Sequence, residues 1–97
     1  MHANAIPKED RRSTRTDVRL PALLRAGPAR AIEVTVLNIS AHGVMAEAGR
    51  PLVPGRPVVL ELAGLAPTAG RIAWTREGHV GVAFDTPLTV AQILAVL

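Results

Sequence analysis

The sequence has no cysteine and only two aromatic residues, Trp74 and Phe84. Without cysteine there can be no disulfide, no thiol catalysis and no cysteine-ligated zinc. No apolar run is long enough to span a bilayer, and residues 1–10 lack the apolar stretch of a secretory signal, so we expect a cytoplasmic location without membrane insertion. The scarcity of aromatics argues against binding of single-stranded DNA or RNA, because barrels that bind it stack successive bases on aromatic side chains.

Groups for catalysis and metal binding are also scarce. The histidines His2, His42 and His79 have no carboxylate or second histidine at metal-ligand spacing. Ser13 and Ser40 lack the surroundings of an activated nucleophile, and no glycine-rich loop leads into a helix to hold a triphosphate. We therefore expect no catalytic residue, no metal site, no cofactor and no enzymatic activity.

The 97 residues suffice for one domain, and their 48% hydrophobic content is normal for a folded protein. The net charge of +3 is unevenly placed. Residues 1–30 contain seven basic and three acidic groups, whereas the rest of the chain contains four basic and five acidic groups. An excess of positive charge at one end predicts that an anionic partner binds there.

Alternating apolar and polar residues predict a series of short β-strands joined by Gly/Pro turns. The expected strands cover residues 17–24, 32–36, 44–48, 58–62, 71–75 and 80–84. Pro21 favours an edge position for the first strand, and the alternation puts Trp74 on the same face as Ile72, in the core. This pattern predicts an all-β fold, a small six-stranded antiparallel β-barrel, because closure removes exposed edges.

The two ends of the chain depart from the β pattern. Residues 1–16 have no hydrophobic periodicity and are expected to form a flexible basic arm, which leaves 17–97 as the barrel domain. Residues 87–97 are expected to form a short C-terminal helix. Its apolar residues Val90, Ile93, Leu94 and Leu97 have helical spacing, which predicts that they pack on the barrel.

Two short motifs occur, one before the first predicted strand and one after the second. The first is Arg11-x-x-x-Arg15, in the arm, and the second is Asn38-Ile39-Ser40-Ala41-His42-Gly43, after the second strand. Together they resemble the paired motifs of the PilZ domain family, Arg-x-x-x-Arg and Asp/Asn-x-Ser-x-x-Gly. Arg19-Leu20-Pro21, Trp74 and Gly81-Val82-Ala83-Phe84 are also similar to strands of that family, and the first position of the second motif is Asn where Asp is common.

The resemblance implies a PilZ-like split barrel that binds the bacterial second messenger cyclic di-GMP. Arginine can bond phosphate bidentately, pair with the O6/N7 edge of guanine and stack on a base, and Asn and Ser can add hydrogen bonds to a guanine edge. Glycine at position 43 is expected to permit a turn with positive φ and close approach of the backbone. The implied binding residues are Arg11, Arg12, Arg15, Asn38, Ser40 and Gly43, with Arg71 and His42 as weaker candidates.

Other interpretations of the same residues remain open. The arginines could be solvated charges on the arm, and Asn38, Ser40 and Gly43 could serve only as turn formers. The expected role is a receptor or adaptor that signals, through an arm ordered by ligand, to a partner protein of unknown identity. The alternative is an interaction adaptor of pilus or flagellar motility with little nucleotide binding, and a nucleic-acid binder ranks third.

Overall fold

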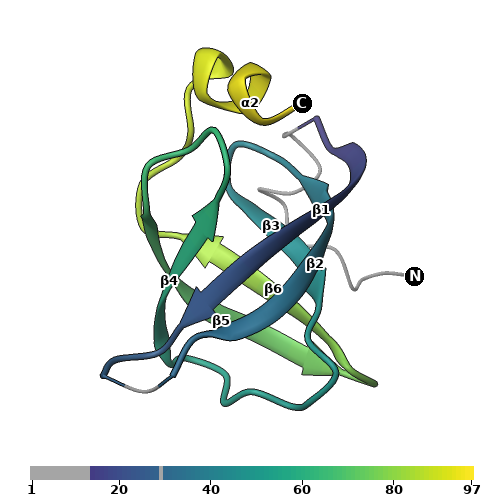
Figure 1. The fold of residues 1–97 in the computed structure, drawn as a ribbon, viewed down its shortest axis with the longest axis vertical. Helices are drawn as coiled ribbons and strands as arrows, with labels where there is room; N and C mark the ends of the chain where they lie inside the picture. The colour runs from purple at the N-terminus through teal and green to yellow at the C-terminus, as the bar shows by residue number, and fades with distance from the viewer. Residues whose placement is uncertain (1–13, 29) are drawn as a thin grey trace, which may run out of the picture.

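The described part of the chain, residues 14–28 and 30–97 of a computed structural model, folds into a closed antiparallel barrel. Neighbouring strands follow the order β1-β2-β3-β6-β5-β4, and β4 closes onto β1 (Figure 1). The strands are β1 (Thr16–Arg25), β2 (Ile32–Ile39), β3 (Gly43–Glu47), β4 (Pro57–Leu62), β5 (Thr68–Arg76) and β6 (His79–Phe84). The predicted all-β, six-stranded barrel is confirmed.

Aliphatic side chains from every strand fill the barrel. The largest fully buried ones are Leu24, Ile39, Leu60, Ile72, Val36 and Val80. Burying one such side chain contributes about 1.5–3 kcal/mol relative to leaving it in water, so this core is the main stabilising term of the fold. The expectation of an edge position for β1 is wrong, since β1 pairs with both β2 and β4. Pro21 is accommodated because pairing with β4 begins only at Ala22.

Helix α2 (Val90–Val96) lies over one end of the barrel (Figure 1). It begins later than the expected residue 87, because Thr89 forms a capping box in which its hydroxyl accepts from the Gln92 amide and its own amide donates to Gln92 Oε1. Val96 is buried and Ile93 is partly buried against the core. The predicted packing of Val90, Leu94 and Leu97 is wrong, because all three are exposed. The helix has no charged residue, so periodicity alone could not tell its inner face from its outer face.

Three irregularities in strand register distort the barrel. They lie between Asp17 and Leu20 in β1, between Val36 and Asn38 in β2, and between Ile72 and Trp74 in β5. An extra residue on one strand of a pair shifts the following side chains to the other face of the sheet. Ile72 is therefore buried while Trp74, two residues later, is 40% exposed, and the prediction that Trp74 belongs to the core is wrong.

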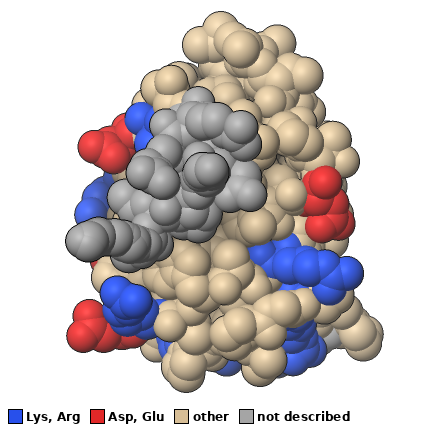
Figure 2. Space-filling view, turned by 180° about the vertical axis from the view of Figure 1, so that it is seen from behind, with Lys and Arg blue, Asp and Glu red and all other residues tan. Residues whose placement is uncertain are grey.

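Charged side chains of both signs are distributed over the surface. Figure 2, which shows the back of the molecule, has the acidic and basic side chains of the described residues in separate small groups rather than in one continuous basic field. Within residues 14–28 and 30–97, no helix is long and apolar enough to cross a membrane.

Candidate functional site

A row of paired residues crosses five strands on the outside of the barrel. Asp17 of β1 pairs with Asn38 of β2, Asn38 with Met45 of β3, Met45 with Gly81 of β6, and Gly81 with Trp74 of β5. Their chain neighbours Ile39, Val44, Val80 and Val82 are buried in the core, so the row itself faces outward. Residues far apart in the sequence are thereby brought onto one surface, which we call the binding face.

Arg15 reaches this surface from just before β1. Its Nη1 donates a hydrogen bond to Oδ1 of Asn38 at 3.2 Å, across 23 residues of sequence. The contact joins one residue from each of the two motifs. An arginine presents its N–H donors in a planar fork, so a bond to an amide oxygen orients the guanidinium. Asn38 therefore positions Arg15 at one end of the binding face.

The turn between β2 and β3 is held by Ser40, which is buried with 3% exposure. The Ser40 amide donates to the Gly43 carbonyl at 2.9 Å, and its hydroxyl donates to the same carbonyl at 3.4 Å. The hydroxyl also accepts from the His42 amide at 3.2 Å. These bonds use the polar groups of Ser40 to shape the turn beside Asn38.

Gly43 is needed for a reason other than the expected one. The prediction of a positive φ is wrong, since Gly43 is not among the glycines of the described residues with positive φ. A Cβ at this position would instead overlap the carbonyl oxygen of Val82 in the neighbouring strand β6. The close approach that requires glycine is thus between the backbones of β3 and β6, and not between the backbone and a ligand. Glycine here lets β3 begin directly against β6.

The indole of Trp74 lies across Gly81. A Cβ added to Gly81 would overlap Nε1 of Trp74, which shows that the absence of a side chain on β6 makes room for the ring. The ring thus covers Gly81, which is buried, while Trp74 itself stays 40% exposed. A flat, partly exposed indole can stack on a planar aromatic ligand.

A pocket of about 350 Å³ joins these elements. Its wall includes Arg15, the turn residues Ser40, His42 and Gly43, and Trp74 of β5. Of the weaker candidates, His42 therefore lines the pocket. Arg71 does not, because its Nη1 donates to the Gly55 carbonyl in the β3–β4 loop at 3.1 Å.

Two predicted residues, Arg11 and Arg12, lie outside the described residues. The other four, Arg15, Asn38, Ser40 and Gly43, lie close together at the β2–β3 turn, and their role in ligand binding stays a prediction. Trp74 was missed as a residue of this surface, and the signal that could have found it is Gly81, a glycine in an apolar strand that marks close approach of another group. No cluster of metal-binding side chains occurs in residues 14–28 and 30–97.

The chemistry of the pocket suits a planar, hydrogen-bonding anion. Within the pocket, the Arg15 guanidinium offers charge and directional donors, and Trp74 offers an aromatic surface. Asn38 does not line the pocket, but its amide oxygen holds Arg15 there. Phosphate binds arginine bidentately, and a purine base stacks on indole. A ligand that contains both groups can use both ends of the pocket at once.

Comparison with known sequences gave one family. The sequence profile of the PilZ domain matches residues 9–97. A search among curated proteins found no significant match.

Proposed function

Because the profile covers nearly the whole sequence, the chain belongs to the PilZ domain family, and on that premise we propose that it is a receptor that binds cyclic di-GMP on the binding face. The family is one of cyclic di-GMP-binding domains, which act as receptors and adaptors rather than as enzymes. The proposal assigns the nucleotide to residues of this chain.

The observation that carries the assignment is the contact between Arg15 and Asn38 beside an exposed Trp74. Cyclic di-GMP has two phosphates and two guanines. Arg15 would bond a phosphate or the O6/N7 edge of a guanine, and Asn38 would hold Arg15 and bond a guanine edge. Trp74 would stack on a base, since base–aromatic stacking contributes about 1–3 kcal/mol per base.

The remaining motif residues have supporting roles in this proposal. Ser40 and Gly43 keep the β2–β3 turn in the shape that presents Asn38 and His42 to the ligand. Arg11 and Arg12 would add guanidinium groups from the arm. Arm residues that take up a fixed position on the ligand would change the surface available to a downstream protein partner. We place this signalling in the cytoplasm, where the nucleotide is made.

Isothermal titration of the full chain tests the proposal. We expect cyclic di-GMP to release heat with saturation, and GMP and GTP to bind far more weakly, because neither offers two bases and two phosphodiesters in one ring. The chain has one tryptophan, so a change in its intrinsic fluorescence on titration reports directly on Trp74. Saturable binding with unchanged fluorescence would remove Trp74 from the site, and equal binding of GMP would remove the nucleotide assignment.

A second candidate function is a protein-interaction adaptor in motility with little nucleotide binding. The specific observation in its favour is the exposed apolar outer face of α2, formed by Val90, Leu94 and Leu97. This candidate predicts no titration heat with cyclic di-GMP and partner capture that the nucleotide leaves unchanged. Binding of single-stranded nucleic acid is disfavoured, because Trp74 and Phe84 are the only aromatic residues in the sequence and two rings cannot stack a series of bases.

A further inference from the structure

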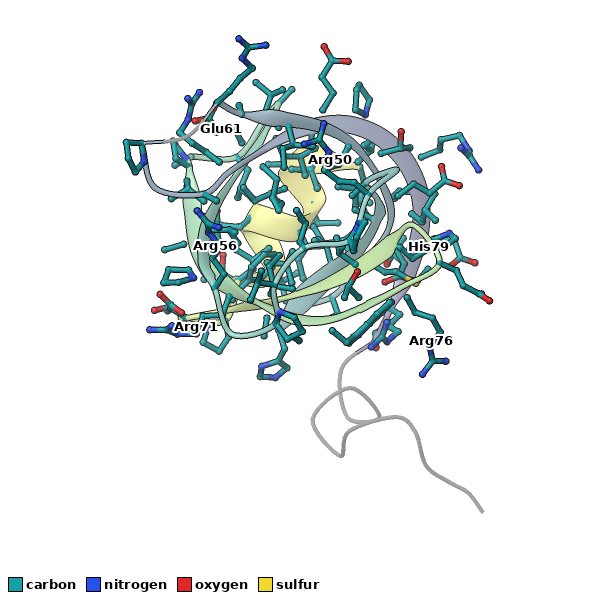
Figure 3. All side chains as sticks on the ribbon, turned by 90° about the horizontal axis from the view of Figure 1, so that it is seen from below. Arg50, Arg56, Glu61, Arg71, Arg76 and His79 are labelled. Carbon is teal, nitrogen blue, oxygen red and sulfur yellow. The ribbon has the colours of Figure 1, made fainter. Side chains whose placement is uncertain are left out.

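The end of the barrel opposite α2 contains a hollow that the binding face does not include. Its volume is about 370 Å³. Its floor reaches the core residues Leu24, Val58 and Ile72, and partly buried Ile32 and Leu52 line its sides. Figure 3 looks along the barrel into this end, with α2 visible beyond. The core is therefore covered by a helix at one end and by a loop at the other.

That covering loop, which joins β3 to β4, is anchored to β5. The Gly55 amide donates to the Ile72 carbonyl at 2.6 Å, and the Ile72 amide donates to the Arg56 carbonyl at 3.0 Å. Arg71 Nη1 donates to the Gly55 carbonyl, and prolines 51 and 54 restrict the loop further. The hollow is thus a preformed feature, so little ordering entropy opposes binding.

Three arginines surround the opening, namely Arg30 before β2 and Arg50 and Arg56 on the loop. Within residues 14–28 and 30–97 their side chains have no hydrogen bond or ion pair, and no Asp or Glu lines the hollow. Figure 3 places Arg50 and Arg56 on different sides of the opening. Val53, on the same loop, exposes 62% of its surface. We call this feature the arginine-rimmed hollow.

We propose that the arginine-rimmed hollow binds an acidic peptide segment of a partner protein, with an apolar side chain in the hollow and carboxylates on the arginines. The apolar walls and exposed Val53 supply the contact for the anchor side chain. The arginines supply charge complementarity, because guanidinium bonds carboxylate bidentately.

The combination of an apolar hollow with separated charges favours a peptide over an anionic lipid surface. A bilayer could offer a head group to each arginine, but its polar surface would leave the apolar hollow unfilled. Carboxylates placed before and after an anchor residue reach opposite sides of the opening together. The site is independent of the proposed nucleotide site, because the residues lining the two pockets do not overlap.

A random peptide library displayed on phage, selected on the full chain, tests the proposal. We expect enrichment of sequences in which Asp or Glu flanks a large apolar residue. Synthetic copies of the enriched peptides should then bind at least about tenfold more weakly to the Arg50→Glu/Arg56→Glu variant, since the substitution replaces attraction by repulsion. Arg76→Glu is the matched control: Arg76 is exposed, lies outside the hollow and should leave binding within about twofold.

Three results would overturn the proposal. The first is that no sequence enriches. The second is that enriched peptides lack acidic residues or bind the double variant as tightly as the parent. The third is that phosphatidylglycerol vesicles bind through Arg50 and Arg56 while peptides do not. Circular dichroism and cyclic di-GMP titration of the double variant should match the parent, which separates loss of the peptide site from unfolding and from failure of the nucleotide proposal.

Discussion

The binding face and the arginine-rimmed hollow both present arginine, but the groups that surround the arginine differ. On the binding face, Arg15 is held by Asn38 and shares a pocket with a flat indole. At the hollow, Arg50 and Arg56 stand without partners among the described residues, over an aliphatic floor. The guanidinium of Arg15 therefore lies beside a surface for planar rings, whereas those of Arg50 and Arg56 lie beside a hollow for an apolar side chain. Neighbouring groups, more than charge, determine what an arginine can recognise.

The backbone beneath the two regions also differs. Three of the four pairings that carry the binding face contain a register shift, in β1, β2 and β5, and only the β3–β6 pairing is regular. The pairings of β4 with β1 and β5 contain no shift. Bulges redirect side chains, and they concentrate next to functional sites. The hollow needs no such redirection, because its floor consists of ordinary inward-facing residues at the end of the barrel.

The largest effect, on the stability of the fold, is expected from Gly43→Val. This variant tests whether a residue of the binding face can be changed without destabilising the barrel. A branched side chain would press on the Val82 carbonyl, so we expect a loss of at least about 2 kcal/mol in the free energy of unfolding. Thermal unfolding measures this. Gly27→Ala is the control, because no atom lies near its new Cβ and only its positive φ costs about 1 kcal/mol. Equal melting temperatures for the two variants would contradict the close approach of β3 and β6.

Arg15→Ala, compared with Arg56→Ala, should distinguish the two regions by their effect on nucleotide affinity. We expect cyclic di-GMP binding to weaken at least about tenfold, or about 1.4 kcal/mol, because a charge-assisted bond is lost. Arg56→Ala, at the hollow, should leave the nucleotide affinity unchanged. Calorimetry on both variants is the measurement. If Arg15→Ala and an Arg11→Ala variant both bound like the parent, the assignment of the nucleotide to this face would be wrong.

Replacing the indole should have a smaller effect. Trp74→Leu removes the stacking surface, and we expect roughly fivefold weaker binding of cyclic di-GMP. Trp74→Phe keeps an aromatic ring and should retain most of the affinity. Gly81→Ala should weaken binding as well, although it leaves the tryptophan in place, because its Cβ displaces the ring. Unchanged affinity in both Trp74→Leu and Gly81→Ala would exclude the indole from recognition.

Ser40→Ala should have the smallest effect. The variant loses the hydroxyl bonds that hold the β2–β3 turn, so we expect about 1 kcal/mol less stability and roughly threefold weaker nucleotide binding. Denaturant unfolding and calorimetry measure the two quantities. Ser40→Thr preserves the hydroxyl and serves as the control. A loss of binding as large as that of Arg15→Ala would mean that Ser40 contacts the ligand directly.

The alternation of apolar residues predicted the barrel because a strand with one buried face has a period of two. Val34 and Val36, for example, lie in the core as their spacing requires. The same rule failed at Trp74, because a bulge within β5 changes the phase, and the residues of β5 themselves do not reveal it. It failed again in α2, where both faces are apolar.

Part of the candidate site was predictable for a different reason. Arg15 and Asn38 belong to motifs with fixed spacing, and the closed sheet brings them together. The reason for glycine at 43 was not predictable, since it depends on the carbonyl of Val82 in a strand that pairs only in the folded barrel. The arginine-rimmed hollow has no motif, because its arginines come from two separate loops that only the closed barrel brings to the same end.

The β2–β3 turn also carries two backbone bonds to the segment that leads into α2. The Phe84 amide donates to the His42 carbonyl at 2.9 Å, and the Leu88 amide donates to the Ala41 carbonyl at 2.8 Å. These bonds connect the β2–β3 turn to the residues that precede α2. A ligand that shifted the turn would therefore also shift the start of the helix, and with it the exposed apolar residues Val90 and Leu94.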